Sequence, residues 1–548
     1  MHLRYCIAAL ALVAGSVGCA QQAPAQHVAS HQFFQVHLGP ASTSPESGRL
    51  LLFAISAQDA VRGKDGAVDS VDANPFGGTE SAVAAREVSY LAPAQNVDMD
   101  ADQLAYPKPY SQLKPGDYYV QAVLDVGHTY AYSGRGAGDL VSDVLKMHLP
   151  SDVPPEFALT RTLPAADPWV LPGSTPAELR EAEAAARQHA SLIDFVSPSL
   201  SAFWGRPITM RGRVLTPPDY DAKASTRYPT VYYTQGYGGN NDRVIGTLVY
   251  VYDAMARGEM PPMIWVFLDE SSPTGTHEFA DSVNNGPWGQ ALTTELMPQL
   301  EANYRMDSRP DGRLLNGHSS GGWATLWLQT RYAKVFGGTW STSPDPSDFH
   351  DFTGVDIYAP AANVYRKPDG SAYPLVRDHA KVLASFEQFA QLERVLGSYG
   401  GQMSSFDWVV SPRGKDGRPE PMFNRDTGAV DPSVVAYWRD HYDIANRLQQ
   451  NWPALKPDLD GKIHLIVGTA DTFYLDGAAH KLKAVLDGLH AKSDFRFLPN
   501  RTHGDLYTIG NDRHGLLKQI SWEMYAVARP DSKLKAPAAQ QPAAASAR

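Results

Sequence analysis

The sequence predicts an α/β protein whose doubly wound, mostly parallel sheet is preceded by a separate β-sandwich domain. Three observations support this. Residues 192–528 alternate short, continuous apolar runs with segments of helical periodicity, which is typical of parallel strands buried on both faces. Residues 31–150 instead hold runs rich in aromatic and β-branched residues, bounded by turn residues. At 548 residues the chain is also too long for one ordinary domain.

The first domain is expected to consist of short strands. Residues 33–38, 49–55 and 141–149 each fit a strand, and residues 113–124 give the clearest case. There, a Pro-Gly turn precedes a run rich in tyrosine and valine. Because no long helical pattern interrupts these runs, we expect a sandwich that is immunoglobulin-like in general architecture.

The chain after residue 150 divides into three parts. Residues 151–191 are predicted to form a proline-rich linker and then a helix that ends near residue 190. Residues 192–528 form the α/β domain, and in it residues 346–453 interrupt the alternation as an insertion, which we expect to act as a lid. Residues 529–548, rich in alanine, proline and glutamine, are predicted to be disordered. Strands are expected at 208–215, 229–234, 263–268, 463–467 and 495–498, and a helix at 290–304.

The N-terminus has the features of an export signal. Residues 1–19 contain Arg4, an apolar run from 5 to 14 and then small residues, and the apolar run is too short to span a membrane. Cys19 lies where a bacterial lipoprotein signal would be cut, and cleavage near Ala20 or Ala25 is the alternative. We therefore expect a periplasmic or outer-membrane lipoprotein, or a secreted protein, whose only membrane contact is a lipid anchor at Cys19.

Composition excludes several other classes of protein. The formal net charge is -11 and no basic stripe is present, which argues against nucleic-acid binding. The chain has 2 cysteines, Cys6 and Cys19, so the mature protein has neither a disulfide nor a cysteine-based metal site. No His-Glu-x-x-His motif or phosphate-binding loop occurs, and we expect neither a metal nor a cofactor.

One motif carries the expected chemistry. Gly317-His318-Ser319-Ser320-Gly321 has the form Gly-x-Ser-x-Gly between an apolar strand-like run and a helix-compatible run. A sharp turn between strand and helix would expose the Ser319 hydroxyl, and only glycines fit on either side of so tight a turn. With 45 glycines in the chain, the pattern alone is weak evidence. His318 is expected to pack beneath the turn.

A serine nucleophile needs a base and an acid that orients the base. Asp471 and His503 follow the serine in the expected chain order, and each comes soon after a predicted strand. The sequence therefore predicts the triad Ser319–Asp471–His503. Other residues compete for the last two positions and are less well placed, namely Asp476 for the acid and His480 and His514 for the base.

A second loop is predicted to hold the oxyanion. Gln235-Gly236-Tyr237-Gly238-Gly239 directly follows a predicted strand and is rich in glycine. The predicted donors are the backbone N–H groups of Tyr237 and Ser320, with Gly236 as the next candidate. A plain turn is the alternative.

Trp288 has two alternative positions in the prediction. Its place in the sequence fits either the wall of a substrate pocket or the protein core, and the sequence does not separate the two.

Several landmarks identify a family resemblance. Residues 195–525 resemble the esterase-D-type esterases of the α/β-hydrolase superfamily, which include feruloyl, acetyl-xylan and siderophore (enterochelin) esterases, S-formylglutathione hydrolases and mycolyltransferases. Gln235 stands where this family usually has histidine. The resemblance implies an α/β-hydrolase fold with a Ser-His-Asp triad. The matching segments are residues 215–220, 228–233, 235–239, 294–305, 317–322, 343–345 and 468–471.

The sequence thus favours an exported serine carboxylic-ester hydrolase that works through an acyl-enzyme. Its expected partner is a small-molecule or glycan-linked ester, with carbohydrate-linked acyl esters as the main hypothesis. A siderophore trilactone esterase and an acyltransferase are alternatives of similar chemistry. A catalytically inactive surface binding protein is the alternative from another class.

Overall fold

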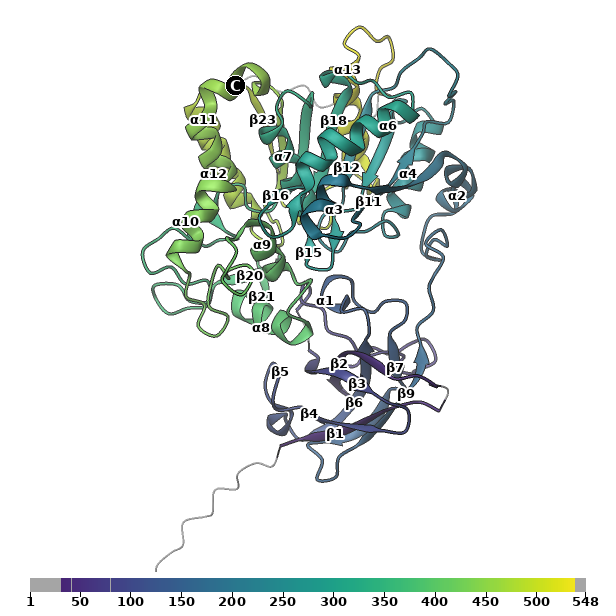
Figure 1. The fold of residues 1–548 in the computed structure, drawn as a ribbon, viewed down its shortest axis with the longest axis vertical. Helices are drawn as coiled ribbons and strands as arrows, with labels where there is room; N and C mark the ends of the chain where they lie inside the picture. The colour runs from purple at the N-terminus through teal and green to yellow at the C-terminus, as the bar shows by residue number, and fades with distance from the viewer. Residues whose placement is uncertain (1–30, 41, 79, 538–548) are drawn as a thin grey trace, which may run out of the picture.

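The computed structural model describes residues 31–537 except 41 and 79, and it shows two bodies joined by an extended connection (Figure 1). The smaller, N-terminal body is made of strands, and the larger body is an α/β domain. The expected signal at 1–19, Cys19 and the last part of the predicted tail, 538–548, lie outside the described residues.

The β domain contains nine strands joined by hydrogen bonds into one sheet. Their order is β4-β1-β9-β7-β6-β2-β3-β5, and β8 pairs with β6. All neighbouring pairs are antiparallel except β1 and β9, which are parallel. The strands are β1 (Phe33–Leu38), β2 (Glu46–Ser56), β3 (Ala82–Leu91), β4 (Asn96–Asp100), β5 (Ala105–Tyr106), β6 (Gly116–Asp125), β7 (Leu140–Ser142), β8 (Leu145–Leu149) and β9 (Glu156–Thr162).

Two features of this domain differ from the sequence prediction. Strand β9 lies inside the segment expected to be a linker, so the β domain continues to Thr162. In addition, β6 pairs with β8 through its first half and with β7 near its end, which links all strands in one sheet. The inward side chains of most of these strands form one apolar cluster. The immunoglobulin-like arrangement stays a prediction.

The larger body is built on an eight-stranded mixed sheet of order β10-β11-β13-β12-β18-β19-β22-β23. Pairs involving β11 are antiparallel, and the other strands run parallel. The expected α/β fold with a mostly parallel sheet is therefore confirmed. The strands are β10 (Ala190–Val196), β11 (Thr209–Leu215), β12 (Thr230–Thr234), β13 (Ile264–Leu268), β18 (Arg313–His318), β19 (Gly338–Thr342), β22 (Ile463–Gly468) and β23 (Ser493–Leu498).

Helices cover both faces of this sheet, which explains the continuous apolar runs of its central strands (Figure 1). On one face lie α2 (Ala177–His189), α4 (Ile245–Ala256) and α13 (Gly515–Ala528). On the other lie α6 (Met297–Asn303), α7 (Ser320–Arg331), α11 (Ile444–Leu459) and α12 (Leu475–Gly488). In the described part of the chain, no helix combines the length and apolar character needed to cross a membrane. This body also contains several short elements. They are the helices α3 (Pro198–Trp204) and α5 (Trp288–Ala291), the π-helical segment Leu292–Leu296, and two strand pairs, β14 (Ser271–Ser272) with β15 (Gly275–Thr276) and β16 (Asp281–Ser282) with β17 (Gly286–Pro287).

The segment between β19 and β22 contains the whole predicted insertion, 346–453. It holds a hairpin and three helices before α11, which crosses over the sheet and spans the predicted end of the insertion at 453. The elements before α11 are β20 (Pro374–Asp378), β21 (Lys381–Ser385), α8 (Phe386–Leu396), α9 (Gln402–Val410) and α10 (Pro432–His441).

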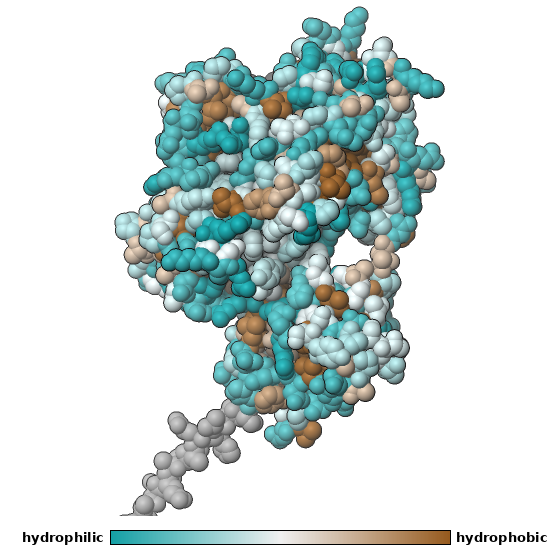
Figure 2. Space-filling view, in the orientation of Figure 1, coloured by the Kyte–Doolittle hydropathy of each residue, from teal (hydrophilic) through white to brown (hydrophobic). Residues whose placement is uncertain are grey.

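Helix α8 joins the two bodies. Leu392, Val395 and Leu396 of α8 pack on the second face of the β-domain sheet, which would otherwise be exposed to water. The buried guanidinium of Arg49 in β2 donates hydrogen bonds to the carbonyls of Val395 and Arg394 at the end of α8, and it also pairs with Glu87. Figure 2 shows that the visible surface is largely hydrophilic, with small apolar patches, as expected if these faces are buried.

Candidate functional site

Ser319 lies at the turn between β18 and α7, where the sequence analysis placed a nucleophile. Its backbone has φ 61° and ψ −128°, a conformation that is strained for any residue with a side chain. The Ser319 N–H donates to the carbonyl of Thr342 in β19 (3.0 Å), and its carbonyl accepts from the N–H groups of Trp323 and Asp345. These bonds hold the strained turn in place.

The flanking glycines are required by close packing. A Cβ added to Gly317 would lie 2.1 Å from the carbonyl oxygen of Gly321. A Cβ added to Gly321 would lie 2.2 Å from Thr234 Oγ1, at the end of β12. The turn therefore tolerates no side chain at either position, which is the physical reason for the glycines in the motif.

Asp471 and His503 come together at the same edge of the sheet. His503 Nδ1 lies 2.9 Å from Asp471 Oδ2, and the Asp471 side chain is fully buried. The two loops also touch each other, since the N–H of Ala470 donates to the carbonyl of Arg501. A Cβ at Gly468 would lie 2.0 Å from that same carbonyl oxygen, so the close approach of the loops needs glycine there.

The electrostatics of the pair suit a general base. Burial alone would lower the pKa of His503, but the charge and hydrogen bond of Asp471 outweigh it, and the pKa is raised. Asp345 adds to that rise through its negative charge. For Asp471, burial acts to raise the pKa, and His503 outweighs this effect, so the pKa is lowered and the carboxylate stays ionised. An ionised Asp471 can orient the ring and stabilise its protonated form.

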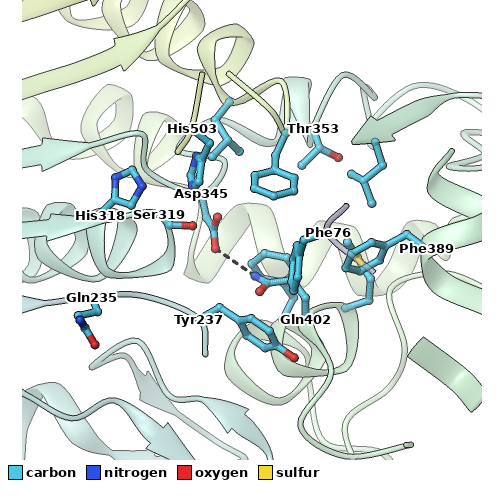
Figure 3. Close-up of a pocket in the computed structure, with 15 residues that line it drawn as sticks. Phe76, Gln235, Tyr237, His318, Ser319, Asp345, Thr353, Phe389, Gln402 and His503 are labelled. Atoms are coloured by element: carbon cyan, nitrogen blue, oxygen red, sulfur yellow. Dashed lines mark hydrogen bonds between the residues drawn. The ribbon is translucent and has the colours of Figure 1, made fainter. Parts of the chain in front are cut away.

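The Ser319 hydroxyl and the His503 ring line the same cavity (Figure 3). Within the described residues the hydroxyl makes no hydrogen bond, and such contacts commonly tighten only when substrate is bound. His318 was expected beneath the turn. Its ring instead lies 4.4 Å from that of His503 and beside Tyr507, and burial lowers its pKa to about 3. His318 is therefore neutral and supports one side of His503.

The competing residues have other partners. Asp476 forms an ion pair with Arg377 (3.0 Å). The His480 ring stacks on Phe497, and the His514 ring stacks on Tyr250. Trp288 packs in the core, where it stacks on His277 and donates to the carbonyl of Asn285.

The loop predicted to hold the oxyanion lies directly against the turn. Gly236 has φ 98°, and a Cβ on it would lie 2.5 Å from the carbonyl oxygen of His318. Within the described chain, the N–H groups of Tyr237 and Ser320 have no hydrogen-bond acceptor. The Tyr237 hydroxyl lies within hydrogen-bonding distance of the carbonyls of Ala131 (2.7 Å) and Gly400 (2.5 Å). The arrangement leaves two N–H donors beside Ser319, as an oxyanion site requires.

Comparison with known proteins identifies the family. Residues 204–488, more than half of the chain, match the model of a family described as "Putative esterase". The chain belongs to this esterase family.

Individual relatives match a shorter part of the chain. Esterase MT1326 (Mycobacterium tuberculosis strain CDC 1551 / Oshkosh) and Esterase Rv1288 (strain ATCC 25618 / H37Rv) are each 31% identical to this chain over 145 residues. That alignment covers 25% of this chain, and the chain spans 30% of the length of each relative.

Solved structures are similar to part of the chain. A ferulic acid esterase matches with a TM-score of 0.38 and 15% identity, over 62% of this chain and 98% of its own. An S-formylglutathione hydrolase from Agrobacterium tumefaciens matches with a TM-score of 0.36 and 12% identity, over 62% of this chain and 94% of its own.

A cavity beside Ser319 is lined by further side chains besides those of the predicted triad. Its volume is about 280 Å³. The end nearest Ser319 is polar, and the far end is lined by aromatic and aliphatic side chains (Figure 3). Those apolar side chains come from three parts of the chain: Phe76 from the β domain, Leu375, Phe389, Met403 and Phe406 from the insertion, and Phe473 and Leu475 from the loop after β22 and the first residue of α12.

Sequence analysis did not assign a role to Asp345. Its carboxylate lies at the polar end of the cavity, accepts from the Ser320 hydroxyl (2.5 Å) and from Gln402 Nε2 (3.3 Å), and is nearly inaccessible (Figure 3). Burial raises its pKa to about 6. The carboxyls of Glu270 and Glu278 are buried nearby, and the negative charge of Asp345 adds to the rise that burial causes in their pKa. Two signals in the sequence could have revealed it, the position of Asp345 three residues after the end of β19 and its place in the family-matching segment 343–345.

Two groups of histidine and carboxylate side chains in the described chain are close enough together to hold a metal ion. One is His31, Asp100 and Asp102 on the β domain; the other is Asp348, His350 and Asp443 in the insertion. In the second group, both carboxylates already accept hydrogen bonds from backbone N–H groups. Neither group includes a residue of the predicted triad, and we assign no metal to either.

Proposed function

We propose that this protein is a serine carboxylic-ester hydrolase that uses Ser319, His503 and Asp471. The observation that carries the proposal is the 2.9 Å contact between His503 and the buried Asp471, beside a serine on a strained turn between strand and helix. Membership of the esterase family supports the same class of reaction.

The reaction would proceed in two steps. His503 takes the proton of the Ser319 hydroxyl as the oxygen attacks the ester carbonyl, and the N–H groups of Ser320 and Tyr237 bind the resulting oxyanion. Collapse breaks the bond to the alcohol oxygen, which takes the proton from His503 and leaves. Water, deprotonated by His503, then attacks the acyl-enzyme and releases the acid, which restores the free serine.

The finer features of the function are part of the same proposal. The sequence at residues 1–19 supports export, with lipid attachment at Cys19. The family resemblance supports a carbohydrate-linked acyl ester as substrate. Six insertion residues, Phe389 among them, line the cavity, which supports a lid-like role for this segment.

The nucleophile is tested with Ser319→Ala. This variant should lose at least 1000-fold in kcat towards p-nitrophenyl acetate, on the order expected when a triad member is removed. It should also lose labelling by a fluorophosphonate. Ser433→Ala, which changes an exposed serine at the start of α10, is the matched control and should keep both. Labelling that persists in Ser319→Ala would show that another residue is the nucleophile.

A panel of substrates tests the alcohol partner. The purified protein would be offered acetylated and feruloylated xylan fragments, a catecholate trilactone, and an ester together with a sugar acceptor. Faster release of acid from the xylan esters would support the carbohydrate proposal. Preference for the trilactone would instead support a siderophore esterase, and transfer to the acceptor in place of hydrolysis would support an acyltransferase. An absence of both turnover and labelling would indicate a binding protein.

A further inference from the structure

The β domain supplies part of the cavity next to Ser319. Phe76 belongs to the long loop between β2 and β3, yet its side chain lies in the cavity wall (Figure 3). Its ring contacts three rings from the other body: Tyr237 of the oxyanion loop (5.7 Å between centroids), Phe389 of α8 (5.3 Å) and Phe473 of the Asp471 loop (5.6 Å). One side chain thus touches three of the segments that surround the site.

The loop that carries Phe76 is anchored to its own domain. The N–H of Val71 donates to Gln121 Oε1, and Asp72 forms an ion pair with Arg135. Closer to the tip, the N–H of Phe76 donates to Asn74 Oδ1 (3.0 Å), which closes a local turn. The β domain therefore holds Phe76 in place through a structured loop.

A second contact connects the β domain to the oxyanion loop. Tyr132, in α1 (Tyr130–Ser133), donates its hydroxyl hydrogen to the carbonyl of Gly239 (2.9 Å), and its ring packs edge-on against that of Tyr237. The guanidinium of Arg243 donates to the carbonyl of Ser133. These bonds fix the loop that bears the Tyr237 N–H from the side opposite to Ser319.

We propose that the β domain is a specificity-determining part of the active site, in which Phe76 forms the wall that binds an apolar group of the ester. The inference rests on the proposed ester hydrolysis and adds to it the chemistry of the substrate. The apolar group can belong to either side of the ester, because both the acyl and the alcohol portion must lie next to Ser319. A bulky apolar group would fill the space between Phe76, Phe389 and Phe473, where water has few polar partners.

The test compares esters that differ only in the apolar group. Wild type and Phe76→Ala would be assayed by acid release with methyl 3-phenylpropanoate, 2-phenylethyl acetate and methyl acetate. We expect Phe76→Ala to reduce kcat/KM by about tenfold to thirtyfold for one of the two phenyl esters, as for loss of a buried aromatic contact. Methyl acetate should change less than about threefold. The affected ester identifies whether the acyl or the alcohol portion occupies the wall.

Matched variants separate this role from general stability. Phe33→Ala removes a phenylalanine from the same domain, where Phe33 is partly exposed on β1 and lies outside the cavity, and should leave all three rates unchanged. Phe76→Leu keeps an apolar side chain and should recover part of the lost rate. Equal losses on all three esters, or no loss on either phenyl ester, would overturn the proposal.

A binding measurement tests the role of Phe76 without any catalytic turnover. Titration calorimetry with 3-phenylpropanamide and N-(2-phenylethyl)acetamide, unreactive analogues of the two phenyl esters, would use Ser319→Ala with and without Phe76→Ala. The added substitution should weaken binding of one of the two amides by about tenfold or more. Unchanged affinity for both amides would overturn the role of Phe76, whatever the activity. If instead affinity falls but the wild type hydrolyses no ester, the proposed hydrolysis fails and the role of Phe76 stands.

Discussion

Asp345 lies near Ser319, and its charge should contribute, after that of Asp471, to the pH dependence of catalysis. Catalysis needs neutral His503, so kcat/KM should fall as the pH drops through the raised pKa of that histidine. His503 faces three titratable groups, Asp471, Asp345 and the neutral His318. Asp345→Asn removes one negative charge and lowers the pKa of His503. The acidic limb of kcat/KM should therefore move to lower pH, measured with p-nitrophenyl acetate.

The same variant should also change stability in a pH-dependent way. Burial raises the pKa of Asp345 from 3.8 to about 6, so the folded state binds this proton more tightly than the unfolded state. Ionisation above pH 6 then costs at most about 3 kcal/mol of folding free energy. Asp345→Asn should raise the melting temperature at pH 8 and give no such gain at pH 3.5. An equal gain at both pH values would contradict the assigned ionisation.

Individual site residues could be predicted where a short stretch of sequence indicates their role. Ser319 sits in a five-residue motif, and Asp471 and His503 each follow a strand at the edge where parallel strands end. The contact between Asp471 and His503 agrees with that prediction. Phe76 and Gln402 lie in the cavity because segments that are distant in the sequence come together there. The spacing of residues along the chain does not indicate which distant segments will be neighbours. The roles of these two residues required the structure.

At the scale of elements, the end of α8 and strand β2 form one joint. Arg49 is buried and donates to the carbonyls of Val395 and Arg394, where a positive charge also complements the dipole of the helix. Arg49→Ala leaves these carbonyls without their donor, and we expect a loss of about 3 kcal/mol of unfolding free energy in urea titration. Arg161→Ala, at an exposed arginine of β9 whose nearest carboxylate lies 3.8 Å away, should change stability by less than about 0.5 kcal/mol. Equal effects of the two substitutions would argue against the joint.

The elements themselves were predicted unevenly. The central strands were recognised because strands covered by helices on both faces must be apolar along their whole length. Strand β9 was missed because its alternating, partly exposed residues lie among prolines that suggested a linker. Its place between β1 and β7 depends on pairings with strands far away in the sequence, which local patterns do not encode.

At the scale of the whole molecule, the β domain and the α/β domain share one apolar cluster. Leu51, Phe53 and Val83 of the sheet belong to the same cluster as Leu392 and two other residues of α8. Phe389, one turn before Leu392 on the same helix, lines the cavity beside Ser319. Loss of the contact between the domains should therefore affect both stability and the shape of the substrate site.

This coupling predicts the unfolding behaviour of the intact protein. Because the shared cluster links the two cores, wild type should unfold in one calorimetric transition. Leu392→Ser removes an apolar side chain from the cluster and leaves a polar group there, at a cost of about 3 kcal/mol. We expect the transition of this variant to broaden or split, and the rate with methyl 3-phenylpropanoate or 2-phenylethyl acetate to fall.

The matched control lies on the same helix. Arg394→Ser changes the helix propensity of α8 about as much as Leu392→Ser does, but at an exposed position. The single transition should therefore remain. Two transitions already present in wild type would show that the domains unfold independently, since a cooperative interface requires them to melt together. Phe76 would then be held mainly by its own domain, and substitutions in α8 should leave the preference between the esters unchanged.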